Sequence, residues 1–231
     1  AVPFKILSPI LPTSFQYLGL FTLMCFMLQG GIAVLIMRRI SRDPFVVLSG
    51  SLLFILSVPM INRAFGHTAL TAHWLVLLSV YLILRKDRLK DTKVFIISWS
   101  IIMFLAAMIH PYFLPICAIP LAISLVLTHK SWSSSILKLF IPLAVYVGFF
   151  AWLGGFSIGN SGTSSGLGCY SMNAFSLFYP SGWSEIMSFV KFSKPECGGF
   201  EGNNFLGFGI LLALVFNILL LTFLAIRNRK K

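Results

Sequence analysis

Charged side chains are scarce in this sequence, and acidic ones are the scarcest. Lys, Arg, Asp and Glu together make up 10% of the 231 residues, and only six residues are Asp or Glu. A typical soluble domain carries about 25% charged residues. The shortage therefore excludes an ordinary soluble globular domain.

The motifs of the common nucleotide-binding and zinc enzymes are also absent. The chain has no G-x-G-x-x-G segment, no P-loop, no H-E-x-x-H motif and no C-x-x-C pair. The net charge of +12 comes from short basic clusters between apolar runs. Because no basic helix carries base-reading side chains, this charge does not indicate nucleic-acid binding.

The sequence has long apolar segments instead. Hydrophobic residues make up 58% of the chain, and the mean hydropathy is +0.91. Several runs reach the length of helix that crosses a hydrocarbon core about 30 Å thick. We therefore predict an all-α fold, a polytopic transmembrane helical bundle that forms a single domain over residues 1–231. The seven predicted spans are Tyr17–Met37, Phe45–Ile61, Thr68–Leu84, Val94–Ile109, Tyr112–Leu127, Ile136–Phe156 and Phe205–Ile226.

Basic residues are distributed unevenly between the loops that join these spans. Fourteen of the 18 follow the odd-numbered spans, and the other four are Lys5, Arg63, Lys191 and Lys194. Since cytoplasmic loops carry the excess of Lys and Arg, we predict an outer N-terminus, a cytoplasmic C-terminus and a long extracytoplasmic loop over residues 157–204. We also expect an internal part of a longer protein, because the chain begins outside without a signal peptide.

Polar residues precede the spans that start at the predicted outer face. Arg63 and His67 come before the third span, and His110 comes before the fifth. Helix N-termini favour anions through their free N–H groups and partial positive charge. Two readings stay open for Arg63 and His67, an anion-binding functional site or contact with lipid headgroups. His110 either shares that site or belongs to a turn between helices, and His73 reads as an interfacial or packed polar residue.

The acidic residues divide between the two predicted faces. Asp43, Asp87 and Asp91 stand among basic residues in cytoplasmic loops, where we expect them to balance charge. All three glutamates lie in the outer loop, and Glu201 is the one closest to a helix N-terminus. Glu201 is therefore either part of a site or a carboxylate that stabilises the helix end alone. Asn203 or Asn204 could cap that helix.

The four cysteines form two groups. Cys25 and Cys117 lie inside predicted spans, where we expect packed thiols. Cys169 and Cys197 share the outer loop, and they could form a disulfide if that compartment is oxidising. The sequence leaves this pairing open.

The centres of the spans are almost free of ionisable groups. His73 is the exception, and Lys138 lies near the end of the sixth span. Ion-coupled transporters usually place ionisable groups at mid-membrane. This pattern disfavours a transporter without excluding one.

Five segments, in this order, resemble a known family. They are FQYLGLFTLMCFMLQG, GHTALTAHWLVLL, HPYFLP, YSMNAFSLFYPSGW and FEGNNFLGFG. Together they resemble bacterial inner-membrane proteins that are similar in architecture to GT-C glycosyltransferases, and the likeness covers essentially the whole chain. The resemblance implies an enzyme that takes a sugar from a polyprenyl-phosphate carrier and passes it to an envelope glycan or lipid acceptor on the outer face.

The resemblance also implies roles for particular residues. Arg63, His67 and His110 would bind the phosphate of the donor. Glu201 is the candidate catalytic carboxylate of this chain. Sugar or acceptor would contact Glu201 and Asn173 and stack on Tyr170 and Trp183.

In one respect the chain departs from the family pattern. Such enzymes use a carboxylate of the first outer loop as a base or as a ligand for a divalent metal, and no Asp lies on the predicted outer face. We therefore expect that motif upstream of this segment, so that these 231 residues alone should be inactive. Two other functions stay open, a flippase or transporter of lipid-linked sugars and a non-catalytic membrane scaffold for envelope assembly.

Overall fold

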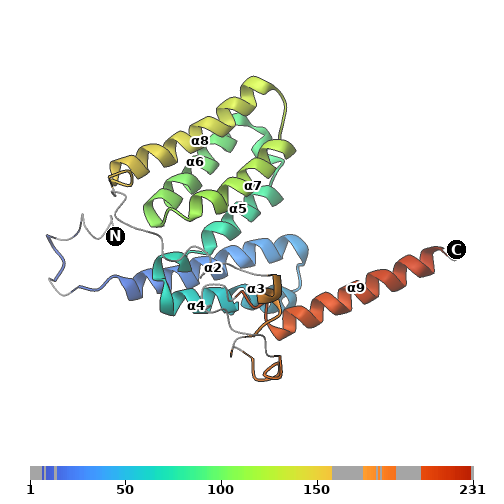
Figure 1. Ribbon diagram of the computed structural model, residues 1–231. Helices are drawn as coiled ribbons and strands as arrows, with labels where there is room; N and C mark the ends of the chain where they lie inside the picture. The colour runs from blue at the N-terminus through green and yellow to red at the C-terminus, as the bar shows by residue number, and fades with distance from the viewer. Residues whose placement is uncertain are drawn as a thin grey trace. The chain divides into compact units, whose positions relative to one another are not determined.

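The computed structural model describes residues 7, 9–12, 15–157, 174–180, 182, 184–190 and 204–229. Over these ranges the protein is all helical, with no strand (Figure 1). The predicted all-α fold is thus confirmed for the described residues. The α-helices are α2 (Leu18–Ile40), α3 (Pro44–Ile55), α4 (Val58–Gly66), α5 (Trp74–Leu84), α6 (Thr92–Ile109), α7 (Phe113–Leu127), α8 (Trp132–Trp152) and α9 (Phe208–Arg229); the 3-10 helices are η1 (Thr68–Thr71), η2 (Arg88–Lys90) and η3 (Ala174–Leu177).

Four of the helices are long and apolar enough to cross a membrane, namely α2, α6, α8 and α9. A fifth crossing is formed if α3 and α4, which are bent by 41° at a short break, count as one span. The segment Thr68–Leu84 and helix α7 are apolar but shorter. The structure therefore fits a membrane protein with four or five such helices, and the count of seven spans and their orientation stay predictions.

Two predicted spans are not continuous helices. The second was expected to run unbroken from Phe45 to Ile61, but α3 ends at Ile55 and α4 begins at Val58. Pro59 explains this break, because proline has no N–H to donate to the preceding turn and is tolerated only in the first turn of a helix. The third was expected to be helical from Thr68, but η1 ends at Thr71 and α5 begins only at Trp74.

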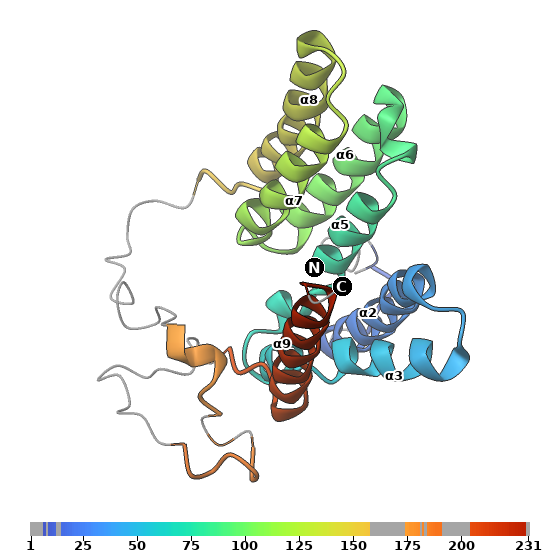
Figure 2. The same cartoon turned by 90° about the vertical axis from the view of Figure 1, so that its right-hand side faces the viewer.

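The described chain forms two compact units. Unit 1 comprises residues 1–56 and 62–161, and unit 2 comprises residues 57–61 and 162–231. In unit 1, α6 packs against α7 and α8, α5 packs against α2 and α7, and α2 lies beside α3 (Figure 2). Its buried core includes Phe95, Trp99, Met103, Phe113 and Leu121. The single-domain assignment stays a prediction.

Unit 2 has little buried surface of its own in the described residues. None of the apolar window Phe208–Arg227 in α9 is buried. Just before α9, Phe205 is buried and the N–H of Leu206 donates to the carbonyl of Leu177 at 3.2 Å. A helix that is apolar around its whole circumference requires a lipid or protein environment.

Sequence signals at the helix ends of unit 1 explain where several helices start and stop. Asp43 accepts hydrogen bonds from the N–H groups of Phe45 (2.7 Å) and Val46 (3.2 Å), and Pro44 is the first residue of α3. At the end of α8, Gly154 has φ +78°, and Gly155 N–H donates to the Phe150 carbonyl at 2.9 Å. An N-cap residue followed by proline commonly starts a helix, and a glycine with positive φ commonly ends one.

Candidate functional site

Arg63 and His67 lie one helical turn apart where α4 ends. Arg63 belongs to α4, and its carbonyl accepts the N–H of His67 at 3.0 Å. The carbonyl of His67 then accepts the N–H of Leu70 at 2.8 Å, which begins η1. Arg63 was expected in a loop and is instead held by a helix, whereas His67 lies in the connection as predicted.

His110 ends α6 and is fixed by the turn that leads into α7. Its backbone is extended (φ −163°, ψ 139°), and its N–H donates to the Ala106 carbonyl. The ring atom Nδ1 accepts the N–H of Tyr112 at 3.2 Å, and the two rings meet edge to face with centroids 4.7 Å apart. Because Nδ1 is an acceptor, the neutral ring of His110 carries its hydrogen on Nε2 and can donate it.

Electrostatic interactions place these residues at one end of unit 1. Partial burial, and then the nearby His67, lower the pKa of His110 below its ordinary value, so this ring is neutral near pH 7. Arg63 interacts electrostatically with His73, the residue before α5. We call Arg63, His67, His73 and His110 the histidine end. It contains the three residues predicted to bind phosphate, and its charge comes from Arg63 rather than from His110.

Helices that start at the histidine end have no side-chain cap. The N-cap residues of α2, α5 and α7 are Tyr17, His73 and Tyr112, and none of them accepts a hydrogen bond from the first turn through its side chain. All three have αR backbone angles. A capping side chain reaches the first turn from an extended N-cap residue, so these helix starts cannot be capped in that way. In α5 and α7 the first-turn N–H groups donate to backbone carbonyls instead, Leu75 to Ala72 at 3.1 Å and Phe113 to His110 at 3.1 Å. The dipoles of these helices still add positive potential at this end.

The remaining predicted site residues lie outside the described residues. They are Glu201, Asn173, Tyr170, Trp183 and the cysteines Cys169 and Cys197. Their roles and the disulfide stay predictions. By contrast, the expected packing of Cys25 and Cys117 is confirmed, because both are buried free thiols. Asn204 does not cap the last helix, since α9 begins four residues later at Phe208.

Within the part of the chain that the structure describes, no three His, Cys, Asp or Glu residues are grouped so that they could hold a metal ion. In particular, residues 15–157 contain only three acidic residues, Asp43, Asp87 and Asp91. Each of them belongs to a connection at the opposite end of unit 1. The chemistry of the described histidine end is therefore hydrogen-bond donation and positive charge, which suits binding of an anion.

Lys138 is an important residue whose role the sequence did not show. It is 1% exposed, and its Nζ donates to the carbonyls of Leu89 (3.5 Å) and Thr128 (3.3 Å) and to Thr128 Oγ1 (3.4 Å). The ammonium also lies 4.9 Å from the centre of the Phe95 ring. These contacts join η2, α6, α7 and α8 at the end opposite the histidine end. The only available signal was a lysine inside an otherwise apolar helix.

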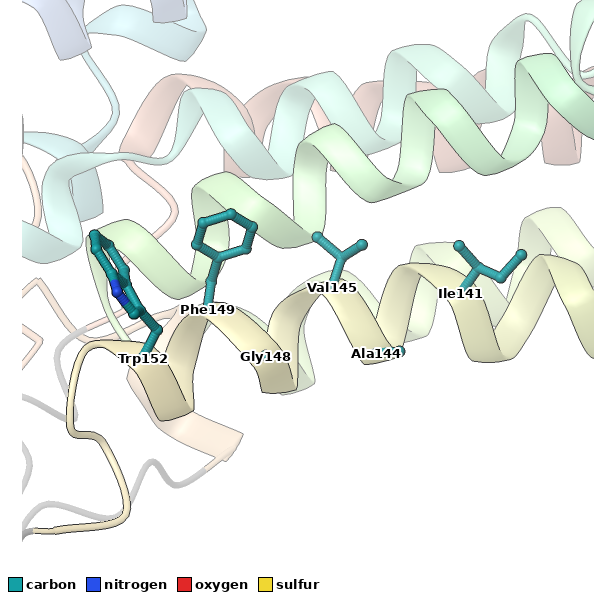
Figure 3. Close-up of a pocket in the computed structure, with 6 residues that line it drawn as sticks. All are labelled: Ile141, Ala144, Val145, Gly148, Phe149 and Trp152. Atoms are coloured by element: carbon teal, nitrogen blue, oxygen red, sulfur yellow. The ribbon is translucent and has the colours of Figure 1, made fainter.

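An apolar groove runs along one face of α8. It has a volume of about 610 Å³ and is lined by Ile141, Ala144, Val145, Gly148, Phe149 and Trp152. The side chains of Ile141, Val145 and Phe149 point to the same side of the helix (Figure 3). Its lining, as far as the described residues form it, is aliphatic and aromatic, which suits a hydrocarbon chain or an apolar helix.

The whole chain matches the model of one protein family. The family model for a domain of unknown function, DUF6311, matches residues 1–231. The chain belongs to this family. No curated protein and no solved structure matched it. Membership of the DUF6311 family does not assign an activity.

Proposed function

We propose that this protein binds a polyprenyl-phosphate-linked sugar with its phosphate at the histidine end. We further propose that it acts as a GT-C-like membrane glycosyltransferase, which transfers the sugar to an envelope glycan or lipid acceptor at the outer face of the bacterial inner membrane. The observation that carries the proposal is the clustering of Arg63, His67 and His110 at one end of unit 1, beside uncapped helix starts.

The chemistry of sugar transfer from a lipid carrier explains why such a cluster is needed. The bond to the phosphate breaks, and negative charge develops on the leaving phosphate. Arg63 supplies a permanent cation with a planar set of donors that matches phosphate oxygens. His110 supplies a neutral Nε2–H donor in a fixed orientation. Donors that are already in place stabilise developing charge without reorganisation.

The distribution of charge supports an outward-facing histidine end. The opposite end carries most of the basic residues of unit 1, and such an excess is typical of cytoplasmic loops. A donor phosphate bound at the histidine end would then lie at the outer face, with its polyprenyl chain in the membrane. In this proposal Glu201 acts on the sugar or acceptor with Asn173, Tyr170 and Trp183, and a divalent metal is optional.

A flippase for lipid-linked sugars is the second candidate. It is favoured by one observation, the absence of any carboxylate of residues 15–157 from the histidine end. A flippase needs to bind the phosphate but needs no catalytic acid or base. Turnover separates the two functions, because a glycosyltransferase consumes the donor in detergent whereas a flippase only moves it across a sealed vesicle. A scaffold would tolerate the double change Glu201→Gln, His67→Ala.

The test of the proposed function is the identity of lipids that co-purify with the full-length protein. Wild type is compared by mass spectrometry with the Arg63→Ala, His67→Ala variant and with a matched control, Arg88→Ala, which removes a charge at the other end. We expect polyprenyl phosphate or its sugar adduct in wild type and control and its loss in the double variant. Equal amounts of ordinary phospholipid alone in all three samples would contradict the proposal.

A further inference from the structure

Two helices of unit 1 begin with a similar series of residues. Helix α3 is preceded by Arg42 and Asp43 and starts with Pro44 and Phe45, and α8 is preceded by Lys130 and Ser131 and starts with Trp132. In each case an exposed basic residue is followed by a capping residue and then by an aromatic side chain. Phe45 is 78% exposed and Trp132 is 79% exposed.

Hydrogen bonds place these two helix starts at the same end of unit 1. The Nη2 of Arg39 donates to the Leu84 carbonyl at 3.4 Å, which joins the ends of α2 and α5. Lys138 joins η2 to the end of α7 through Leu89 and Thr128. The turns that follow α2 and α7 accordingly lie on the right-hand side of Figure 1. We call the basic residues of these connections the basic end: Arg38, Arg39, Arg42, Arg85, Lys86, Arg88, Lys90, Lys93 and Lys130.

The acidic residues of this end do not neutralise it. Asp43 and Asp91 cap α3 and α6, and Asp87 pairs with Lys90 at 2.8 Å. Hydrogen bonds from the N–H groups of Val94 and Lys93, together with nearby lysines, hold the pKa of Asp91 below its ordinary value. Even with all three carboxylates ionised, the nine basic residues of this end outnumber its three acidic residues. The surplus is positive and lies on exposed loops.

We propose that the basic end is a binding surface for anionic phospholipid headgroups. Arg42 and Lys130 contact the phosphates, while Phe45 and Trp132 enter the boundary between headgroups and acyl chains. Aromatic residues at the level of the headgroups and basic residues beside them are the two features that hold a protein at an anionic leaflet.

Lipid fits this surface better than a protein partner does. The charge is spread over three separate connections. The exposed aromatics stand where apolar helices begin, so the surface next to them is apolar, as at a membrane boundary. This inference is independent of the proposed glycosyltransferase activity, since it concerns the opposite end of unit 1.

The test is lipid selectivity of the full chain. The protein is exchanged into equal amounts of phosphatidylglycerol and phosphatidylcholine, and retained lipids are counted by native mass spectrometry. We expect wild type to retain phosphatidylglycerol several-fold over phosphatidylcholine, with the preference falling as salt increases. The variant Arg42→Gln, Arg88→Gln, Lys130→Gln should retain clearly less phosphatidylglycerol relative to phosphatidylcholine than wild type does.

A matched control separates the position of the charges from their number. The variant Lys5→Gln, Lys191→Gln, Lys194→Gln also removes three positive charges, but from the predicted outer side, and it should keep the wild-type preference. The conservative pair Arg42→Lys, Lys130→Arg should keep it too. If the triple variant does not fold, the single changes Arg42→Gln and Lys130→Gln give the same comparison. Equal retention of both lipids by wild type, or an equal loss in the control, would overturn the proposal.

Discussion

At the basic end of unit 1, α3, α6 and α8 start from Asp43, Asp91 and Ser131, and each of these side chains accepts hydrogen bonds from the first turn. At the histidine end, α2, α5 and α7 start without such bonds. Backbone angles show the reason, because the capped starts are extended and the uncapped ones are αR. The basic end thus satisfies first-turn N–H groups with capping side chains, whereas α5 and α7 satisfy theirs with the backbone carbonyls of Ala72, His73, His110 and Pro111.

The two ends also differ in how they use ionisable residues. The basic end holds Lys138 through three hydrogen bonds to groups of the protein, and it uses its carboxylates as caps or in an ion pair. At the histidine end the ionisable residues of 15–157 are Arg63 and three histidines, and Asp43, Asp87 and Asp91 all belong to the opposite end. Such a difference is expected where one end stabilises the bundle and the other binds an anion. Three sets of variants would break or sharpen this comparison.

The largest effect is expected at Lys138. Lys138→Met keeps most of the buried volume but removes three donors, which leaves the carbonyls of Leu89 and Thr128 without them. The free energy of unfolding should fall by about 1–3 kcal/mol, the range for buried acceptors that are left unsatisfied. Thermal unfolding in detergent measures it. Lys130→Met, an exposed neighbour, is the control and should change stability by less than ~0.5 kcal/mol; equal stability of the two variants would refute the structural role.

Removal of the caps should have a smaller effect. Asp43→Ala and Asp91→Ala should each lower the free energy of unfolding by about 1 kcal/mol, because the first-turn N–H groups lose their acceptor. At the other end, Tyr112→Ser should give no compensating gain, since its αR backbone keeps a serine side chain from capping α7. Urea or thermal unfolding of the three variants measures these changes in stability. The prediction is wrong if Tyr112→Ser stabilises the protein, as a new cap would.

The smallest effect is expected from the pH dependence of His110. Its folded-state pKa is lowered, so above pH ~6.5 the ring is neutral in both the folded and unfolded states and contributes no pH dependence. As the pH falls below ~6.5 the unfolded state binds the proton first, and stability falls until the folded pKa is passed. The melting temperature should therefore drop less between pH 7.5 and 5.5 in His110→Gln than in wild type. An identical drop would show that His110 does not titrate in this way.

Much of the fold could be predicted from composition and apolar periodicity. Membrane-length apolar helices, packed Cys25 and Cys117, and polar residues gathered before α5 and α7 all follow from residue type and spacing. The break at Pro59 had a visible signal, as had Asp43 before Pro44, which marks a capped helix start rather than a balanced charge. These were errors of interpretation, because the residues themselves carried the information.

Other features depend on tertiary contacts and could not be predicted. The burial of Lys138 arises because η2, α6 and α7 supply its partners from residues 10 to 49 positions away. The lowered pKa of His110 depends on its partial burial and on His67, which is distant in the sequence. The start of α9 at Phe208 instead of beside Asn204 likewise has no residue-level signal that we can identify.

The central claim is that the histidine end recognises a phosphate attached to an apolar chain. It is tested most directly by the affinity of the full-length protein in nanodiscs for polyprenyl phosphate and for the matching polyprenol, which lacks the phosphate. The account predicts at least about tenfold tighter binding of the phosphate, a difference of ~1.4 kcal/mol, and its loss in Arg63→Gln, His67→Gln but not in Arg88→Gln. Equal affinities for the two lipids, or an undiminished preference in the double variant, would contradict it.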